Sequence, residues 1–222
     1  RFLSCSKVRT NIETTNTIVS CFSSASPQVV FDTSFKTKQR NTIASIQMKQ
    51  MESNNSEEAT RFDYLRDEIA DRLVDRLDDL DHSRTFHKAA DIGCWNGHVF
   101  RAIERRKHLE SKMLSNLSHY DQSKNMLDLA ENRNNTSKSV LNLSYHHLAH
   151  CDGGNEDLGL EENSLDLIFS NLWLHWCNNL PSLLSQMRRA LKPDGLFLGS
   201  MLGGETLSQL RSALVLGEQE IM

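Results

Sequence analysis

The chain has 222 residues, of which 38% are hydrophobic and 24% are charged, so it can bury one substantial core and fits one domain better than two. Its 25 Lys and Arg against 29 Asp and Glu give a formal charge of −4, which argues against nucleic acid as the main partner. Apolar runs stay well below the roughly 18 residues that a membrane span requires. We therefore expect small molecules or proteins as partners and no membrane span.

The N-terminal segment, residues 1–30, is rich in hydroxyl side chains and poor in acids. It contains ten Ser or Thr, three basic residues and one acid, Glu13. This composition is typical of a mitochondrial transit peptide, although an ordinary disordered terminus has a similar one. The five cysteines of the chain are scattered and never spaced as CxxC, so a reducing compartment suits them better than a disulfide framework or a zinc site. The chain begins with Arg, which suggests a start further upstream or a fragment.

Residues 31–60 form the next predicted segment, a basic motif followed by a polar linker. The motif contains Lys36, Lys38 and Arg40, and the linker runs over residues 49–60. Basic side chains of this kind usually form a solvated face, but they are also suited to holding a substrate protein. We expect the folded domain to begin after the linker and to occupy residues 61–222.

Alternating strands and helices are predicted throughout this domain. An amphipathic helix is expected over residues 64–80, where Leu65, Ile69, Leu73 and Leu77 recur every four residues. The patterns after it predict strands at 86–92, 116–120, 141–148, 165–170 and 196–201, and helices at 98–106, 123–132 and 183–191. A turn is expected at 192–195, and a capping box at Thr206 and Gln209 predicts a last helix. The fold class is therefore α/β, a doubly wound, mostly parallel sheet.

In such a sheet a ligand lies beyond the carboxyl ends of the strands, where the strand order reverses. The turn after the first strand contains Asp91, Gly93 and Gly97, and its two glycines allow the backbone to approach a ligand closely. Asp121 follows the second strand, where a carboxylate can accept hydrogen bonds from two ribose hydroxyls. These residues indicate a nucleoside site, although a tight turn with a charged residue at a helix start would show the same pattern.

Four segments together resemble the class I S-adenosylmethionine-dependent methyltransferases, whose fold is Rossmann-like. They are the Asp-x-Gly-x-x-x-Gly turn at 91–97, Asp121-x-Ser123-x-x-Met126-Leu127, the strand and its lead-in at 163–170, and Leu-Lys-Pro-Asp-Gly at 191–195. The resemblance implies S-adenosylmethionine as cofactor, with Asp91, Gly93 and Gly97 at its amino-acid end and Asp121 at its ribose. Asp152, after the third strand, is then expected near the adenine amino group.

A narrower resemblance is to the complex I assembly factor 5 family of mitochondria, described as methyltransferases or protein-arginine hydroxylases. It is carried by Phe31-Asp32 with the basic motif, by residues 62–68, by Leu-His-Trp-Cys-Asn-Asn-Leu-Pro at 174–181, and by Gly-Gly-Glu-Thr-Leu at 203–207 with Leu210-Arg211. The likeness runs from about residue 31 to 218 and does not reach the family's C-terminal third, so we expect the C-terminal strands of the sheet to be missing. It implies a complex I subunit as the protein substrate, in the mitochondrial matrix or on the matrix face of the inner membrane.

One position departs from this family. Trp95 stands where the family has glycine, inside the loop that should lie against the cofactor. An indole there must swing outward or occupy the space of the ligand, and in the second case we expect no measurable cofactor binding.

The expected catalytic residues follow the fourth strand, where a substrate would enter. His175 is the candidate base or orienting donor, with Asn171 beside it, although His175 and Trp176 are equally suited to capping the sheet. Methyl transfer needs mainly alignment of the nucleophile, so few catalytic residues are expected. Hydroxylation would need an oxidant and normally a metal or flavin. The two His-x-Asp pairs, His119 with Asp121 and His150 with Asp152, have the spacing of an iron motif, but we expect no metal because nine histidines produce such pairs readily by chance.

Three functions follow, in this order. The first is a methyltransferase-like enzyme that modifies a complex I subunit, by methylation or arginine hydroxylation, during assembly of the complex. The second is a small-molecule carboxyl methyltransferase, because the Leu-His-Trp segment and the layout are also similar to the malonyl-carrier-protein methyltransferases. The third is a non-catalytic assembly scaffold, which Trp95 favours.

Overall fold

A five-stranded parallel sheet forms the centre of the computed structural model, which describes residues 29–53, 63–81, 83–106, 109, 113–135, 137, 139–148, 151–152 and 155–221. The strands are β1 (Phe86–Ile92), β2 (Leu114–Asp121), β3 (Asn142–His147), β6 (Leu165–Asn171) and β7 (Leu191–Ser200). Their order across the sheet is β3-β2-β1-β6-β7, and all four pairings are parallel. The chain thus winds outward from β1 in one direction and then from β6 in the other, which confirms the doubly wound fold. The order reverses between β1 and β6, so a ligand crevice is expected at the carboxyl ends of these two strands.

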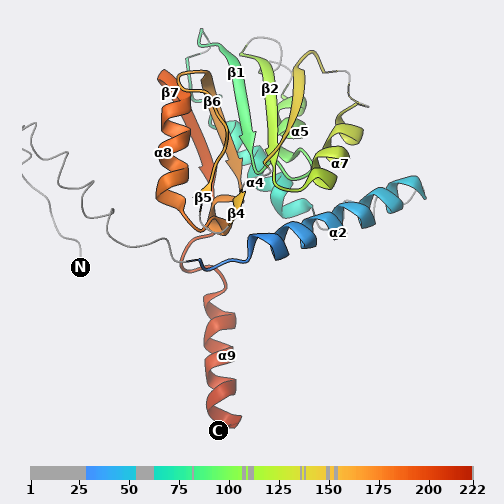
Figure 1. Cartoon of the computed structure of the whole chain (residues 1–222), viewed down its shortest axis with the longest axis vertical. Helices are drawn as coiled ribbons and strands as arrows, with labels where there is room; N and C mark the ends of the chain where they lie inside the picture. Colours follow the sequence, from blue (N-terminus) through green and yellow to red (C-terminus); the bar gives the residue numbers. More distant parts are fainter. Residues whose placement is uncertain are drawn as a thin grey trace, which may run out of the picture.

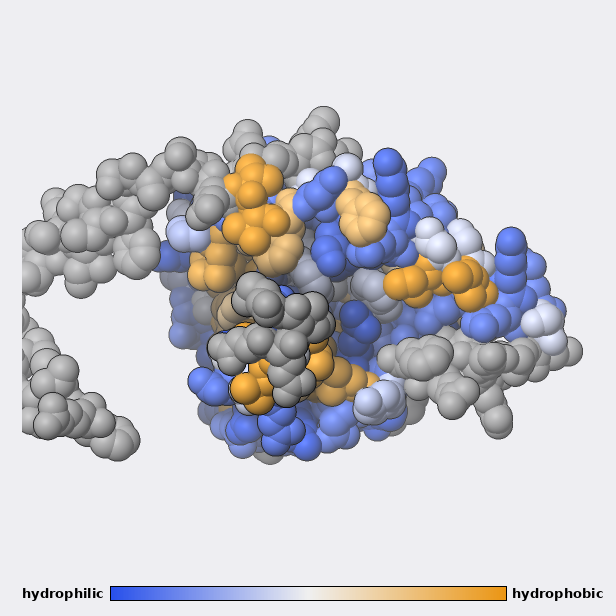
Figure 2. All heavy atoms as spheres, turned by 90° about the horizontal axis from the view of Figure 1, so that it is seen from below, coloured by the Kyte–Doolittle hydropathy of each residue, from blue (hydrophilic) through white to orange (hydrophobic). Residues whose placement is uncertain are grey.

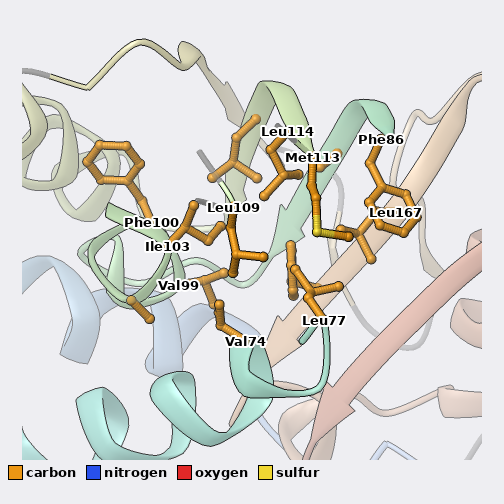
Figure 3. Close-up of a cluster of buried hydrophobic side chains, with 14 of the residues drawn as sticks. Val74, Leu77, Phe86, Val99, Phe100, Ile103, Leu109, Met113, Leu114 and Leu167 are labelled. Carbon is orange, nitrogen blue, oxygen red and sulfur yellow. The ribbon is translucent and has the colours of Figure 1, made fainter. Parts of the chain in front are cut away.

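Helices cover the two faces of the sheet (Figure 1). The helix α4 (Tyr64–Asp75) packs on α5 (His98–Arg105) over one face, and α8 (Leu180–Ala190) covers part of the other. The side chains of Val74, Leu77, Val99, Phe100 and Ile103 meet those of the strands in the first of these layers (Figure 3). This burial is the main stabilising contribution to the fold.

Most predicted elements form where the sequence placed them. The helix α7 (Lys124–Asn134) begins after Ser123, whose side chain accepts the Met126 N–H, and α8 carries Pro181 in its first turn. The helix predicted over 64–80 ends at Asp75 and continues as turns. The turn predicted at 192–195 lies within β7 as an irregularity: Leu165 pairs with Leu191 but Leu167 pairs with Leu196, and Asp194 has φ +64°.

The sequence pattern did not predict α2 (Thr33–Glu52), a helix of 20 residues. Part of the predicted linker, Lys49 to Glu52, forms its last turn, whereas residues 54–60 lie outside the described residues. Its buried positions are Thr33, Arg40, Ala44 and Gln47, which share one helical face although only Ala44 is apolar. An apolar stripe was therefore absent. Figure 1 shows α2 crossing beyond the carboxyl ends of β1 and β2, where it packs against α7.

The last helix, α9 (Ser208–Ile221), projects away from the sheet (Figure 1). The view from below in Figure 2 shows hydrophobic residues among hydrophilic ones at the surface. Several large hydrophobic residues on or next to this helix are exposed, namely Leu207, Leu210, Leu214, Val215 and Leu216. Within the described part of the chain, no helix combines the length and apolarity needed to cross a bilayer.

Gly93 joins β1 to the loop at the tightest point of this fold. Its φ is +75°, and a Cβ there would lie 2.1 Å from Cγ of Trp173. We expect Gly93→Ala to lower the free energy of unfolding by roughly 3 kcal/mol or more, because a left-handed residue and an overpacked core are both costly. Gly159→Ala is the matched control, with φ +60° and no atom within 4 Å of the added Cβ, and should cost only about 1 kcal/mol. Equal losses in urea denaturation would show that Trp173 does not set the constraint at Gly93.

Candidate functional site

The loop between β1 and α5 bends sharply at the carboxyl end of the sheet. Gly93, Trp95 and Gly97 have φ values of +75°, +55° and +85°. The backbone N–H groups of Gly93 and Cys94 both donate to the carbonyl of Tyr120, at 2.8 and 3.1 Å, which fixes the loop against the end of β2. The predicted strand-to-helix turn is therefore present, and Trp95 holds a conformation that is uncommon for a residue with a bulky side chain.

Asp91 lies at the end of β1, entirely buried, and faces His119 of β2. Its Oδ2 is 3.6 Å from Nδ1 of His119, while neither carboxylate oxygen accepts a hydrogen bond from a described residue. His119 contacts the ring of Phe100 on α5, with centroids 6.3 Å apart. Burial raises the pKa of Asp91, and the nearby His119 ring opposes that rise. The predicted cofactor residue thus has unused acceptors, but they lie in the layer covered by α5.

Asp121, the predicted ribose acceptor, is fully buried and already occupied. Nη1 of Arg40 donates to both of its carboxylate oxygens, at 2.9 and 2.7 Å. The backbone N–H groups of Trp95 and Ser123 donate to the same carboxylate, at 3.1 and 2.8 Å. Arg40 comes from α2, so the helix that sequence analysis missed provides the cation at the centre of the site. The one available signal was the place of Arg40 in the basic motif of the resembling family.

The indole of Trp95 points into the crevice. Two guanidinium groups lie close to its ring, with Cζ of Arg66 4.2 Å and Cζ of Arg40 4.9 Å from the ring centroid. The ring also packs in the same cluster as Ala44 of α2 and Met126 of α7, and Trp95 is only 9% exposed. Of the two expected orientations, the ring has the inward one, where it lines a cavity under α2.

A cavity remains beside these residues. Its volume is about 90 Å³, and the residues that line it are Thr33, Lys36, Gln39, Arg40, Ile43, Arg66, Trp95, Gln122 and Trp176. Sites for ligands of drug-like size usually enclose about 300 to 1,000 Å³. In this arrangement the residues do not fit a nucleoside cofactor, because Arg40 occupies Asp121 and Trp95 fills the adjoining space. Gly93 and Gly97 have the left-handed φ values that glycine favours, and Asn96, next to Gly97, donates to Gln47 of α2.

The Asp63 carboxylate holds the far side of α2. It accepts hydrogen bonds from Asn96 Nδ2 at 2.9 Å, from Arg133 Nη1 at 3.1 Å and from Gln47 Nε2 at 3.4 Å. These partners belong to the β1–α5 loop, to α7 and to α2. Since one buried carboxylate connects all three, the position of α2 is coupled to that of the loop that carries Trp95.

The two predicted catalytic residues have different surroundings. Asn171, at the end of β6, donates from Nδ2 to the carbonyl of Arg66 and accepts from the Ser200 hydroxyl, so both of its polar ends hold neighbouring elements. His175 lies in the 3₁₀ turn η2 (Leu174–Trp176), half-buried, and its buried Nδ1 has no hydrogen-bond partner among the described residues. Burial, together with Arg66, Arg40 and Lys36, lowers the pKa of His175, so its imidazole is neutral near pH 7.

The remaining site predictions concern the strand after β3. Asp152 belongs to β4 (Cys151–Asp152), which pairs with β5 (Asn155–Glu156), and its side chain lies outside the described residues, as does His150. In the other His-x-Asp pair, His119 and Asp121 have different partners. His119 faces Asp91, and Asp121 binds Arg40. Within the part of the chain that the structure describes, no three His, Cys, Asp or Glu residues cluster as a metal site would require.

Comparison of the sequence with known proteins identifies relatives of this chain. A methyltransferase domain family matches residues 90–199. The mitochondrial arginine-hydroxylase NDUFAF5 of Danio rerio is 36% identical over 200 residues, which are 90% of this chain and 53% of the relative. The protein of the same name in Homo sapiens is 35% identical over 199 residues, 89% of this chain and 49% of the relative. The chain is a relative of the NDUFAF5 proteins and contains a methyltransferase domain.

The match begins well before the sheet and includes most of the chain, but it spans only about half the length of these curated relatives. A malonyl-[acyl-carrier protein] O-methyltransferase of Methylovorus sp. (strain MP688) is also similar, with 31% identity over 149 residues, 67% of this chain and 47% of the relative. The family resemblance and the methyltransferase fold that sequence analysis predicted are thus confirmed.

Removing one partner of the buried Arg40–Asp121 ion pair should lower the stability of the fold far more than removing one partner of an exposed pair. We expect Arg40→Met to lower the free energy of unfolding by about 3 kcal/mol, because it leaves a buried carboxylate without its counter-charge. Adding Asp121→Asn should recover part of this loss, since the amide oxygen still accepts from the two backbone N–H groups. In the control, Arg72→Met removes an exposed pair with Glu68 and should change stability by less than about 1 kcal/mol. Strictly additive losses in urea denaturation would contradict direct coupling of Arg40 to Asp121.

Proposed function

We propose that this chain is the S-adenosylmethionine-binding part of a mitochondrial protein that acts in the assembly of respiratory complex I. In this proposal it modifies a complex I subunit, by methylation or by arginine hydroxylation, on the matrix side of the inner membrane. The observation that carries the proposal is the similarity to NDUFAF5 proteins over about nine tenths of the chain. This similarity includes α2, which lies outside the matched methyltransferase domain. It also includes the segment around His175, which lies inside that domain on the side where a substrate would enter.

The site supports the proposal at the substrate end. His175 presents a neutral imidazole directly after the strand end where a substrate would enter, which suits a base or an orienting group. Trp176 lies beside it, with ring centroids 4.9 Å apart, and lines the cavity. His175 is therefore the residue proposed for proton transfer or substrate orientation, and Asn171 is proposed as a positioning residue that ties β6 to α4 and β7.

Cofactor binding in this proposal requires α2 to move. Arg40 has to leave Asp121 before ribose hydroxyls reach that carboxylate, and the Trp95 ring loses the guanidinium and Ala44 contacts that hold it inward. The arrangement described above is then a closed conformation with α2 as its cover. A ligand shifts such an equilibrium only through its preference for the open form, so S-adenosylmethionine is expected to bind with an affinity reduced by the cost of opening.

Two other functions keep specific support. A small-molecule carboxyl methyltransferase is favoured by the similarity to the malonyl-carrier-protein enzyme and by the cations in the cavity. A non-catalytic assembly scaffold is favoured by Trp95 and by the occupied Asp121. In the scaffold, the closed form would be the working form.

Depletion of the protein in its source organism separates these functions. The proposal predicts a fall in fully assembled complex I, measured by native electrophoresis and by NADH-dependent respiration, with biotin-dependent carboxylase activity unchanged. Restoring the protein with His175→Asn should leave assembly impaired, whereas restoring it with the wild-type sequence or with an exposed control, His87→Asn, should repair it. Normal complex I with a loss of carboxylase activity would contradict the proposal and favour the carboxyl methyltransferase. Full repair by His175→Asn would instead favour the scaffold.

A further inference from the structure

The cavity beneath α2 carries more positive than negative charge. Lys36, Arg40 and Arg66 all line it, and Arg40 is neutralised by Asp121. No carboxylate of a described residue lies within 4.0 Å of the Lys36 ammonium or of the Arg66 guanidinium. The acid nearest in sequence to Lys36 is Asp32, whose carboxylate accepts from Ser34 and Phe35 at the start of α2 and is exposed. Two cations of the cavity therefore have no ion-pair partner among these residues.

The same two cations are held in place by aromatic rings. Nζ of Lys36 lies 3.8 Å from the centroid of a Trp176 ring, and Cζ of Arg66 lies 4.2 Å from that of Trp95. Trp176 is itself held against Phe31, with centroids 5.4 Å apart, and Asn178 binds both backbone groups of Phe31. Stacking uses the face of a guanidinium and leaves its N–H groups, which lie in the plane, free to donate. The heads of both cations are thus oriented before any ligand arrives.

The positive charge inside the cavity affects the pKa of the neighbouring His175. Burial, together with Arg66, Arg40 and Lys36, lowers the pKa of His175. Burial and the charge of Arg40 also lower the pKa of Arg66, while Asp63 and Asp121 act to raise it. Mutual repulsion of this kind in a partly buried space is relieved most simply by an anion. The cavity volume of about 90 Å³ is well below the roughly 300 to 1,000 Å³ of sites for drug-sized ligands, which suits a small group such as a carboxylate or phosphate rather than a nucleoside.

We propose that this cavity binds the carboxylate or phosphate group of a small anionic molecule, with Lys36 and Arg66 as its ligands and Trp95 and Trp176 as its walls. Charged hydrogen bonds from both sides make the site selective for anions. In the arrangement described here, a cation in the cavity would meet two like charges and no unpaired carboxylate, so the covered site favours an anion over a cation. Because Lys36 belongs to α2 and Arg66 to α4, a bound anion also connects the cover to the body of the domain.

The test uses the intrinsic fluorescence of the full chain, because two of its three tryptophans form the walls of the cavity. Malonate and inorganic phosphate are titrated separately in the absence of S-adenosylmethionine, and N-acetylarginine amide serves as the cationic probe. Lys36→Met and Arg66→Gln each remove one proposed ligand. Lys38→Met is the matched control, since Lys38 is an exposed residue of the same helix that does not line the cavity.

We expect a saturable change in fluorescence with malonate or phosphate, and the tighter of the two identifies the chemical source of the anion. Affinity should fall at least tenfold in Lys36→Met and Arg66→Gln and stay unchanged in Lys38→Met, with circular dichroism confirming that each variant is folded. No saturable binding of either anion overturns the proposal. Equal affinity in wild type and Lys36→Met, or binding of the arginine amide as tight as that of the anions, overturns it as well. Failure of cofactor binding leaves this result unaffected, so the two proposals are tested separately.

Discussion

A buried ion pair between α2 and the sheet determines the state of this site. Asp121 has no exposure to solvent, and its carboxylate receives both oxygen contacts from Arg40 in addition to two backbone N–H groups. A carboxylate in this position is costly to bury unless it is paired, and either a cation or ribose hydroxyls meet that requirement. The two solutions exclude each other, because both need the same oxygens. Under the proposed function, the covered arrangement and a cofactor bound at Asp121 therefore exclude each other.

Trp95 extends this constraint from one carboxylate to the whole crevice. Its backbone N–H donates to Asp121 while its ring contacts Arg40 and Arg66, so a single residue contacts both members of the ion pair. Glycine at this position, as in the resembling family, would leave the space empty and the loop free of a bulky left-handed residue. The indole instead gives α2 a surface to pack on. Cover and loop are thus matched to each other, which explains why a polar helix can stay docked.

The strands and most helices were predictable because their signals are local. Alternation, glycine turns and the Ser123 cap each act within a few residues, and parallel order then follows from the alternation of strands and helices. The helix α2 was not predictable in this way, because its buried face consists mostly of Thr33, Arg40 and Gln47, whose burial depends on partners far along the chain. The strand β7 was predicted to begin five residues late, since Pro193 and Gly195 indicate a turn while the neighbouring strand tolerates an irregularity there.

The site shows the same division. Gly93 and Gly97, whose positive φ values shape the loop, lie where the sequence predicts. Asp91 and Asp121 lie at the ends of their strands. Their partners did not follow from spacing. The pairing of Asp91 with His119 depends on strand register, and the pairing of Asp121 with Arg40 joins residues 81 positions apart. A motif identifies the candidates for a site, whereas the state of the site depends on such distant contacts.

Calorimetric titration of the full chain with S-adenosylmethionine tests the closed-site account most directly. The wild-type protein should bind weakly or give no measurable heat, and Arg40→Met should bind at least tenfold more tightly, because the competing cation is gone and the open form is more populated. Lys38→Met should behave like the wild type. Tight binding by the wild-type protein, with no gain in Arg40→Met, would contradict the claim that Arg40 and the cofactor compete for Asp121.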